Sequence, residues 1–351
     1  MNGIPSARDD VLALRSYQAG AQVDNTIRLN ANEAPTQEES SSLNRYPEVR
    51  PAALQARLAD LFGVPRANII VTRGSSEAID ALIRAWCRAY ASSVITTPPT
   101  FDMYRIYAEI QGAAIIHVPL APDDFRLDVD AVLSSCAPDT RLVFLCSPNN
   151  PTGTLVPEAD ILRIADGLEG RAIVVVDEAY IEFARRKSIA DAALKRTNVV
   201  VLRTLSKAHA LAGARCGVAI AAEPLIDVMS KVLPPYSFPT PVVETVIEAL
   251  SAERLSASRA TVDELIRERA RVRSALDALA CVNNTWPSDA NFVLARFADL
   301  PGVVAYLRSR GILIRDFGDT DGLRSCARIT IGAAAENDAL LDALDAFGGS
   351  G

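Results

Sequence analysis

The sequence predicts an α/β protein in which a large domain, with a mainly parallel or mixed sheet sandwiched by helices, is joined to a smaller α+β domain. From about residue 45 to 240, short apolar runs typical of buried strands alternate with amphipathic stretches typical of helices. After residue 240 the pattern changes to one long helical stretch followed by short strands. We therefore expect the large domain over residues 45–240 and the smaller one over residues 1–44 and 241–351.

The expected elements follow one another along the chain. Near the N-terminus, residues 9–18 show a helical pattern and residues 27–35 indicate a strand and a turn. The large domain should contain seven strands, at residues 68–72, 93–97, 114–120, 141–146, 172–177, 198–202 and 216–221, with helices such as 76–90 and 157–168 between them. The smaller domain should contain a helical region over 242–280, strands at 291–297, 312–317 and 327–332, a helix over 301–311 and a C-terminal helix.

Composition excludes several classes of function. The formal net charge of −7 argues against nucleic acid or an acidic membrane surface as the main partner. We find neither a signal-peptide pattern nor an apolar run long enough to span a membrane, so we expect a cytoplasmic protein. Six scattered cysteines without a CxxC pair, and only two histidines, argue against a disulfide framework and a metal site. GxSxG, GxGxxG and GxxxxGK[ST] do not occur, which leaves hydrolase, dinucleotide and P-loop sites without support.

Chemically active residue types lie beside the ends of several expected strands, where ligands of open α/β sheets bind. Asp177, Lys207 and Arg215 each lie beside a different strand end, and Ser75 and Ser76 open the helix that follows the first strand. Each alone is explained as an ordinary turn, helix cap or charged loop residue. Together they fit pyridoxal phosphate, which offers an aldehyde to a lysine amine, a ring nitrogen to a carboxylate and a phosphate to N–H donors and an arginine.

Seven motifs lie along the chain, namely LNANEAP, RYPE, PPTFDMY, CSPNNPTG, DEAYIEF, TLSKAHALAGARCG and ARITIG. They occur in the order and approximate spacing of the histidinol-phosphate aminotransferases. From about Tyr17 to the C-terminal helix, the chain thus resembles this family of fold type I, aspartate-aminotransferase-like enzymes, which use pyridoxal 5′-phosphate. SPNNPTG, DEAY and SKA are typical of the whole superfamily. LNANE, RYPE, Arg315 and Arg328 indicate the narrower family.

The resemblance implies roles for five residues around the cofactor ring. Lys207 would bond to the aldehyde and then act as general base and acid in the proton shift. Asp177 would pair with the ring nitrogen and keep it protonated. Tyr180 and Asn150 would hydrogen-bond the phenolic oxygen, and Phe101 would stack on the ring face.

The resemblance also implies how the cofactor phosphate is held. Backbone N–H groups of Ser75 and Ser76 would bind it together with Ser206 and Arg215. Tyr46 would reach it from the other subunit, which makes the active site shared between the two subunits of a homodimer.

A third set of residues is implied for the substrates. Arg328 would bind the α-carboxylate of glutamate, and Arg315 would be its partner for the phosphate of histidinol phosphate. Tyr17 and Tyr46 would complete this pocket with Asn150. The ordinary alternative for Arg315 is a surface ion pair with a nearby aspartate.

The sequence departs from the family pattern at three positions. Phe101 stands where the family often has tyrosine, so stacking survives and a hydroxyl is lost. Ser76 stands where an acidic residue is frequent, which backbone contacts to phosphate should tolerate. His209 stands where an aromatic residue is frequent, and we interpret it as a substitute that packs beside the cofactor loop.

The expected function is transfer of the amino group of histidinol phosphate to 2-oxoglutarate, giving imidazole-acetol phosphate and glutamate, in histidine biosynthesis. On the same scaffold, an aromatic or broad-specificity aminotransferase and a threonine-phosphate decarboxylase-like enzyme are the alternatives. A regulator or binding module without turnover is a third, against which the presence of Lys207, Asp177, Tyr180 and Arg215 argues.

Overall fold

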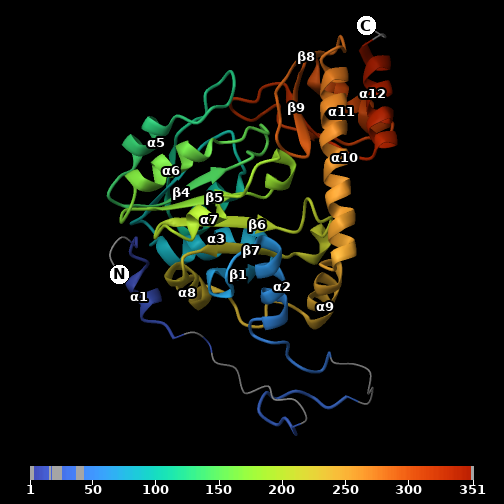
Figure 1. Cartoon of the computed structure of the whole chain (residues 1–351). Helices are drawn as coiled ribbons and strands as arrows, with labels where there is room; N and C mark the ends of the chain where they lie inside the picture. Colours follow the sequence, from blue (N-terminus) through green and yellow to red (C-terminus); the bar gives the residue numbers. More distant parts are fainter. Residues whose placement is uncertain (1–3, 16, 18–25, 37–42, 349–351) are drawn as a thin grey trace.

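The computed structural model describes residues 4–15, 17, 26–36 and 43–348, which form two sheets with their helices (Figure 1). The larger sheet has the strand order β1-β7-β6-β5-β4-β2-β3, and the smaller one has the order β10-β11-β9-β8. The strands of the larger sheet are β1 (Ile69–Thr72), β2 (Ser93–Thr96), β3 (Ala114–His117), β4 (Thr140–Cys146), β5 (Ile173–Asp177), β6 (Val199–Thr204) and β7 (Gly217–Ala221). Those of the smaller sheet are β8 (Val282–Thr285), β9 (Phe292–Phe297), β10 (Arg315–Asp316) and β11 (Cys326–Thr330).

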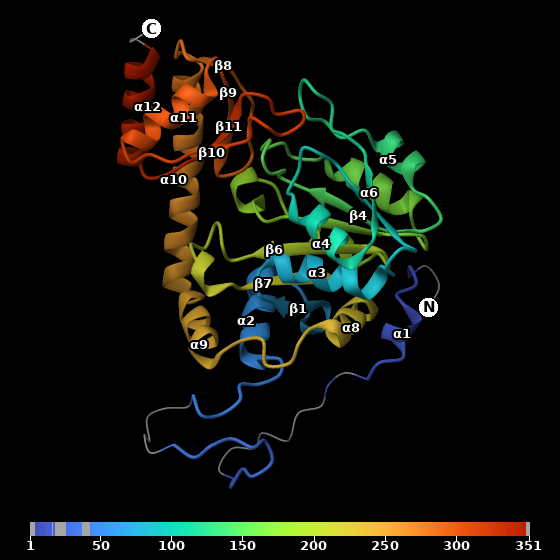
Figure 2. The ribbon, with the colours of Figure 1, turned by 180° about the vertical axis from the view of Figure 1, so that it is seen from behind.

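Helices cover both faces of the larger sheet and one face of the smaller one (Figures 1 and 2). Those of the large domain are α2 (Ala52–Phe62), α3 (Ser75–Trp86), α4 (Met103–Gln111), α5 (Val129–Ser135), α6 (Glu158–Gly167), α7 (Ala190–Ala193) and α8 (Glu223–Val232). The others are α1 (Asp9–Leu12), α9 (Thr240–Ala249), α10 (Ala252–Leu276), α11 (Leu300–Ser309) and α12 (Ala334–Gly348). The predicted fold class is thereby confirmed.

The buried strand β5 shows why the chain forms this sheet. All of its residues are buried, because helices lie on both faces and a two-sided strand needs a continuous apolar run. Val174 and Val176 join the core on the side of α2, α5 and α6, while Ile173 and Val175 join the core on the side of α3, α4 and α8. Only its last residue, Asp177, is charged.

The order and direction of the strands bring several carboxyl ends to one edge. β2, β4, β5 and β6 run parallel, whereas β7 runs antiparallel to both β6 and β1. Gly217, at the start of β7, lies between Thr204 of β6 and Thr72 of β1. A Cβ atom there would lie 2.8 Å from the Arg203 carbonyl oxygen and 2.9 Å from Gly74 Cα. Glycine is therefore required for β7 to start this close to the loop after β1.

The expected helical region over 242–280 is two helices rather than one. α9 ends at Ala249, and Ser251 then caps α10 by accepting a hydrogen bond from the Arg254 backbone N–H. The 25-residue helix α10 runs from the larger sheet to the smaller one, where it packs against α12 and β9 (Figures 1 and 2). The expected strand at 312–317 is reduced to β10, and β8 was not predicted.

The N-terminal segment differs most from the expectation. Residues 27–35 form no strand, and Figures 1 and 2 both show the described parts of 26–50 extending away from the sheets. Residues 4–12 pack against the large domain, where Trp86 Nε1 donates to the Pro5 carbonyl at 3.2 Å and the Arg8 N–H donates to the Ala85 carbonyl at 3.0 Å. These residues thus contact the large domain, and the division of the chain into two domains stays a prediction.

Among the residues described, none of the helices has both the length and the apolar composition needed to cross a lipid bilayer.

Candidate active site

Asp177 is a buried carboxylate at the carboxyl end of β5. Its side chain accepts a hydrogen bond from the Tyr104 hydroxyl at 2.9 Å on Oδ2 and one from the Ala179 N–H at 3.1 Å on Oδ1. Burial raises the pKa of Asp177 to about 6, and the two hydrogen bonds and the positive charge of Lys207 oppose that rise. A carboxylate that remains ionised in a buried site is suited to pair with a cation.

Lys207 follows β6 in a short loop closed by backbone hydrogen bonds. Leu205 N–H donates to the Cys216 carbonyl and Leu211 N–H to the Leu205 carbonyl, each at 3.0 Å. The Lys207 ammonium lies 5.5 Å from the centroid of the Tyr180 ring. Partial burial and the nearby positive charges of Arg328 and Arg215 lower the pKa of Lys207. A lowered pKa increases the fraction of neutral amine, the form that acts as a nucleophile or base.

A cradle for an anion lies where α3 begins. Gly74 has φ of +78°, and a Cβ atom there would lie 2.7 Å from Arg215 Nη2, so the guanidinium fills the space that a side chain would take. Arg215 also donates to Ser206 Oγ at 3.4 Å. The backbone N–H groups of Ser75 and Ser76 are at the start of the 12-residue helix α3, where they have no partner within the helix. A helix N-terminus, a guanidinium and a hydroxyl together fit a phosphate group. The anion cradle thus consists of Gly74, Ser75, Ser76, Ser206 and Arg215.

The smaller sheet contributes two arginines that lie next to each other. Arg315 of β10 is directly opposite Arg328 of β11. Arg328 donates to Asn150 Oδ1 in the loop after β4, and its guanidinium lies 5.2 Å from the ring centroid of Phe292. Arg315 is exposed, and none of the ion pairs formed by the described residues involves it. The surface ion pair with a neighbouring aspartate is therefore not formed.

Tyr180 and Phe101 are the two aromatic residues predicted to lie beside the cofactor ring. The Tyr180 ring contacts Phe292 edge to face, with centroids 5.2 Å apart, and burial raises its pKa. Phe101 lies just before α4 and is half-buried, with its ring centroid 5.6 Å from that of Tyr104. Asp177, Tyr180, Lys207 and Arg328 form one cluster, linked by the contacts and charge interactions given above.

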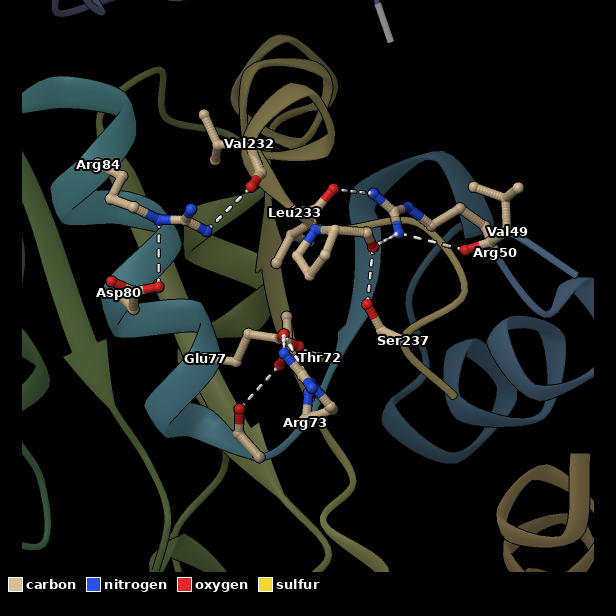
Figure 3. A network of polar contacts seen from close by, with 12 residues as sticks. Val49, Arg50, Thr72, Arg73, Glu77, Asp80, Arg84, Val232, Leu233 and Ser237 are labelled. Atoms are coloured by element: carbon tan, nitrogen blue, oxygen red, sulfur yellow. Dashed lines mark hydrogen bonds and ion pairs between the residues drawn. The ribbon is translucent and has the colours of Figure 1, made fainter. Parts of the chain in front are cut away.

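Tyr17 and Tyr46 do not join this cluster in the single chain. Both lie in the N-terminal segment and pack against Tyr236, with ring centroids 5.9 and 4.7 Å from it. The turn that carries Tyr236 is held by arginines, as Figure 3 shows. Arg50 donates to the carbonyls of Ser230, Leu233 and Pro234 at 3.0–3.1 Å, and Arg84 donates to that of Val232 at 2.9 Å. These bonds satisfy carbonyls at the end of α8.

A groove beside the anion cradle has a volume of about 740 Å³ and is open to solvent. Ser76 and Arg215 line it together with Tyr107 and the Arg73–Glu77 pair, in which Glu77 also accepts from the Arg73 backbone N–H at 2.7 Å (Figure 3). The start of α3 is thus fixed by its own side chains while its outer side is left open.

His209 lies in the same loop, two residues after Lys207, and its side chain is close to Glu182. Its Nε2 atom lies 3.8 Å from Glu182 Oε1, and Glu182 accepts a hydrogen bond from Arg203 at 2.8 Å. Burial lowers the pKa of His209, which favours its neutral form. These contacts are compatible with our interpretation of His209 as a packing residue, which stays a prediction.

The sequence analysis missed two residues of this region. Tyr104 lies within PPTFDMY, and the signal that could have found it is that a tyrosine on the buried side of a helix needs a partner for its hydroxyl. Tyr236 lies in a proline-rich turn, and nothing in the sequence connects it to Tyr17 and Tyr46.

Residues 10–347 match the family model described as aminotransferase class I and II. The chain is 42% identical over 347 residues to the histidinol-phosphate aminotransferase of Stenotrophomonas maltophilia, covering 97% of this chain and 95% of that one. It is 41% identical over 344 residues to that of Aeromonas salmonicida, covering 96% of each. The crystal structure of histidinol-phosphate aminotransferase from Sinorhizobium meliloti in complex with pyridoxal-5′-phosphate superimposes with a TM-score of 0.79 at 27% identity, covering 88% of this chain and 84% of that one.

Proposed function

Because the chain belongs to the class I and II aminotransferases and, within them, to the histidinol-phosphate aminotransferases, we propose that it transfers the amino group of histidinol phosphate to 2-oxoglutarate. The products are imidazole-acetol phosphate and glutamate, and the reaction is a step of histidine biosynthesis. The observation that carries the substrate assignment is the pair formed by Arg315 and Arg328, which offers two cations to an anionic group near Lys207.

The donor set of the site fits pyridoxal 5′-phosphate. Gly74 leaves room for Arg215, and that guanidinium, Ser206 and the N-terminus of α3 would hold the phosphate. Asp177 would pair with the ring nitrogen, and Tyr180 and Asn150 would bind the phenolic oxygen, with Phe101 against the ring. When bound, the cofactor withdraws electrons from the carbon that carries the amino group.

Lys207 is the residue that we propose to bond to the cofactor and to move the proton. Its lowered pKa increases the fraction of neutral amine, the form that a base requires. Once it has taken up a proton, the ammonium is an acid at the same position. Asp177, buried and opposite in charge, compensates that positive charge.

Arg328 and Arg315 would bind the two kinds of anionic substrate at one place. A guanidinium binds a carboxylate through two parallel hydrogen bonds, which suits Arg328 for glutamate and 2-oxoglutarate. Histidinol phosphate lacks that carboxylate, and its phosphate carries more charge, so the second cation of Arg315 is needed. Arg328 is already oriented by Asn150 and by the face of Phe292.

The proposed enzyme is a homodimer in which Tyr46 of each subunit completes the other subunit's site. Support comes from the N-terminal segment, where Ile27 and Leu29 are 91% and 90% exposed. Large apolar side chains that extend from the protein on an open segment indicate a surface that packs against another chain. The open groove beside Ser76 and Arg215 is where a residue of that chain would approach the phosphate. Tyr17 and Tyr46 would then contact substrate, although in the single chain they lie apart from Lys207.

A cytoplasmic location is part of the proposal. All six cysteines are free and buried, as is usual for proteins of a reducing compartment.

Steady-state kinetics on the purified enzyme test the function. With 2-oxoglutarate as acceptor, kcat/KM for histidinol phosphate should exceed that for phenylalanine by at least about tenfold, a difference of about 1.4 kcal/mol. Equal values would favour an aromatic or broad-specificity aminotransferase. Release of carbon dioxide from threonine phosphate would favour a decarboxylase, and an absorbance band that glutamate fails to shift would favour a protein without turnover.

A further inference from the structure

Tyr104 occupies the most enclosed position next to the Asp177 carboxylate. Its side chain is 0% exposed, and its ring stacks on Phe144 with centroids 4.8 Å apart and an interplanar angle of 7°. Phe101 contacts the same ring edge to face. Held by these two aromatic rings, the side chain directs its hydroxyl at Asp177 Oδ2, to which it donates at 2.9 Å. If the hydroxyl group rotated away from Asp177, it would lose this acceptor at a position that is closed to solvent.

We propose that Tyr104 is a positioning residue, whose hydroxyl keeps the Asp177 carboxylate ionised and oriented for the ring nitrogen of pyridoxal phosphate. The inference rests on the proposed function only in the identity of the cofactor. It does not depend on which amine is the substrate.

The surroundings of Asp177 show why one hydroxyl matters. From β4, the Cys146 thiol faces the carboxylate, and burial raises the pKa of that thiol to about 12, so it stays neutral. Tyr180 is neutral as well, because burial raises its pKa. Lys207 provides the positive charge from the loop after β6. Neither neutral group donates a hydrogen bond to Asp177 in the described structure, which leaves Tyr104 and the Ala179 N–H as its donors.

Removal of the hydroxyl would leave Oδ2 buried without a donor. A hydrogen bond donated to an ionised carboxylate stabilises the charged form, so loss of that bond raises the pKa. Without Tyr104 as donor, the pKa of Asp177 should therefore rise from about 6 toward or above neutrality. The aspartate would then be protonated over the range in which it has to pair with the ring nitrogen.

The test compares wild-type apo-protein with Tyr104→Phe, using pyridoxal 5′-phosphate as the probe. The dissociation constant is measured by fluorescence titration between pH 6 and pH 9, and the ratio of variant to wild type is taken at each pH. This ratio cancels the titration of the cofactor itself. We expect it to be near one at pH 9 and about tenfold at pH 6, because the raised pKa costs affinity only below it. A ratio that is the same at every pH, or equal to one throughout, overturns the proposal.

Two controls separate positioning from a structural role. The 1-deaza analogue of the cofactor has a carbon in place of the ring nitrogen. For this analogue, the ratio of the variant's dissociation constant to that of wild type should therefore not depend on pH. Tyr90→Phe makes the same chemical change at a tyrosine that is 96% exposed and should bind the cofactor as wild type does. The same pH dependence with the deaza analogue would contradict a role through Asp177.

A second variant covers the case in which Tyr104→Phe does not fold. Incorporation of 3-fluorotyrosine at position 104 keeps the ring and the hydroxyl but makes the donor more acidic, so the hydrogen bond to Asp177 becomes stronger. Affinity at pH 6 should then increase relative to wild type, and no increase overturns the proposal. If wild type bound the cofactor but did not act on histidinol phosphate, the proposed function would fail while this test kept its meaning.

Discussion

Arg315 and Arg328 face each other across β10 and β11, so two guanidinium groups share one side of the site. Like charges this close are unfavourable unless an anion binds between them. The pKa of Arg328 is already lowered, by burial first and also by the charge of Arg315. We propose this pair as the structural basis for recognition of a phosphate-bearing substrate.

We therefore expect Arg315→Ala to discriminate between the two half-reactions. Loss of one charged hydrogen-bond donor should lower kcat/KM for histidinol phosphate by about ten- to a hundredfold. The value for glutamate should fall much less, because Arg328 alone suits a carboxylate. Single-turnover absorbance changes measure each half-reaction separately. Arg310→Ala, in the same domain, is the control, and equal losses for both substrates would contradict the role of Arg315.

A second prediction concerns stability. The pKa of Asp177 is raised from 3.8 to about 6 in the folded state. Between these two pH values the carboxyl group is therefore protonated in the native apo-protein and ionised in the unfolded chain. Its contribution to the free energy of unfolding should therefore fall by about 2.4 kcal/mol as the pH rises from 4 to 7. Asp177→Asn should abolish that part of the pH dependence, together with most turnover. Urea unfolding of both apo-proteins at several pH values measures it, and parallel curves would refute it.

The anion cradle gives a third prediction. Gly74→Ala places a methyl group where Arg215 Nη2 lies and displaces the guanidinium, so affinity for pyridoxal phosphate should fall by tenfold or more, as the loss of a charged contact implies. Affinity for pyridoxal, which has no phosphate, should change little. Gly170→Ala is a matched control, since Gly170 has φ of +71° and nothing within 4 Å of an added Cβ. Gly170→Ala thus adds a methyl group at a positive φ without a steric contact, so a similar loss of affinity there would contradict a specific role for the space that Arg215 fills.

A fourth prediction tests the shared site. Lys207→Ala should abolish turnover while the cofactor still binds through its phosphate, and Tyr46→Ala should reduce turnover strongly. In a heterodimer of the two variants, one site has both wild-type residues if Tyr46 acts on the partner subunit. Mixing and reassembly of the two inactive proteins should then restore activity. Absence of recovery, with heterodimers verified by tagged pull-down, would place Tyr46 and Lys207 in the same subunit's site.

The sequence predicted the positions of the buried strands and of the polar residues at their ends, for a physical reason. A buried strand such as β5 needs an unbroken apolar run, so the charge of Asp177 at its end is conspicuous, and strand order then places Lys207 on the adjacent strand end. The alternation of apolar runs with amphipathic helical stretches can likewise be recognised within short segments of the sequence. The residues implied by family resemblance, such as Arg315 and Arg328, depended on motif order rather than on periodicity.

What the sequence could not predict depends on contacts between distant segments. The hydroxyl of Tyr104, on α4, donates a hydrogen bond to Asp177 at the end of β5, and no local sequence pattern encodes that pair. The expected strand at 27–35 failed because alternation of apolar residues needs a neighbouring strand, and the described structure offers that segment none. The division of 242–280 at Ser251 was visible only as a weak capping signal within a polar helix.

The antiparallel strand β7 has a consequence for how the protein folds. β1 bonds to no described strand but β7, so the loop carrying Gly74 is joined to the sheet through a segment synthesised far later in the chain. Contacts of such large sequence separation form slowly, because loop-closure entropy is lost before they are made. The anion cradle spans this junction, with Gly74 on one side and Arg215 on the other. We therefore expect cofactor affinity to arise late, at the closure that completes the sheet, and a partly folded chain to lack a competent site.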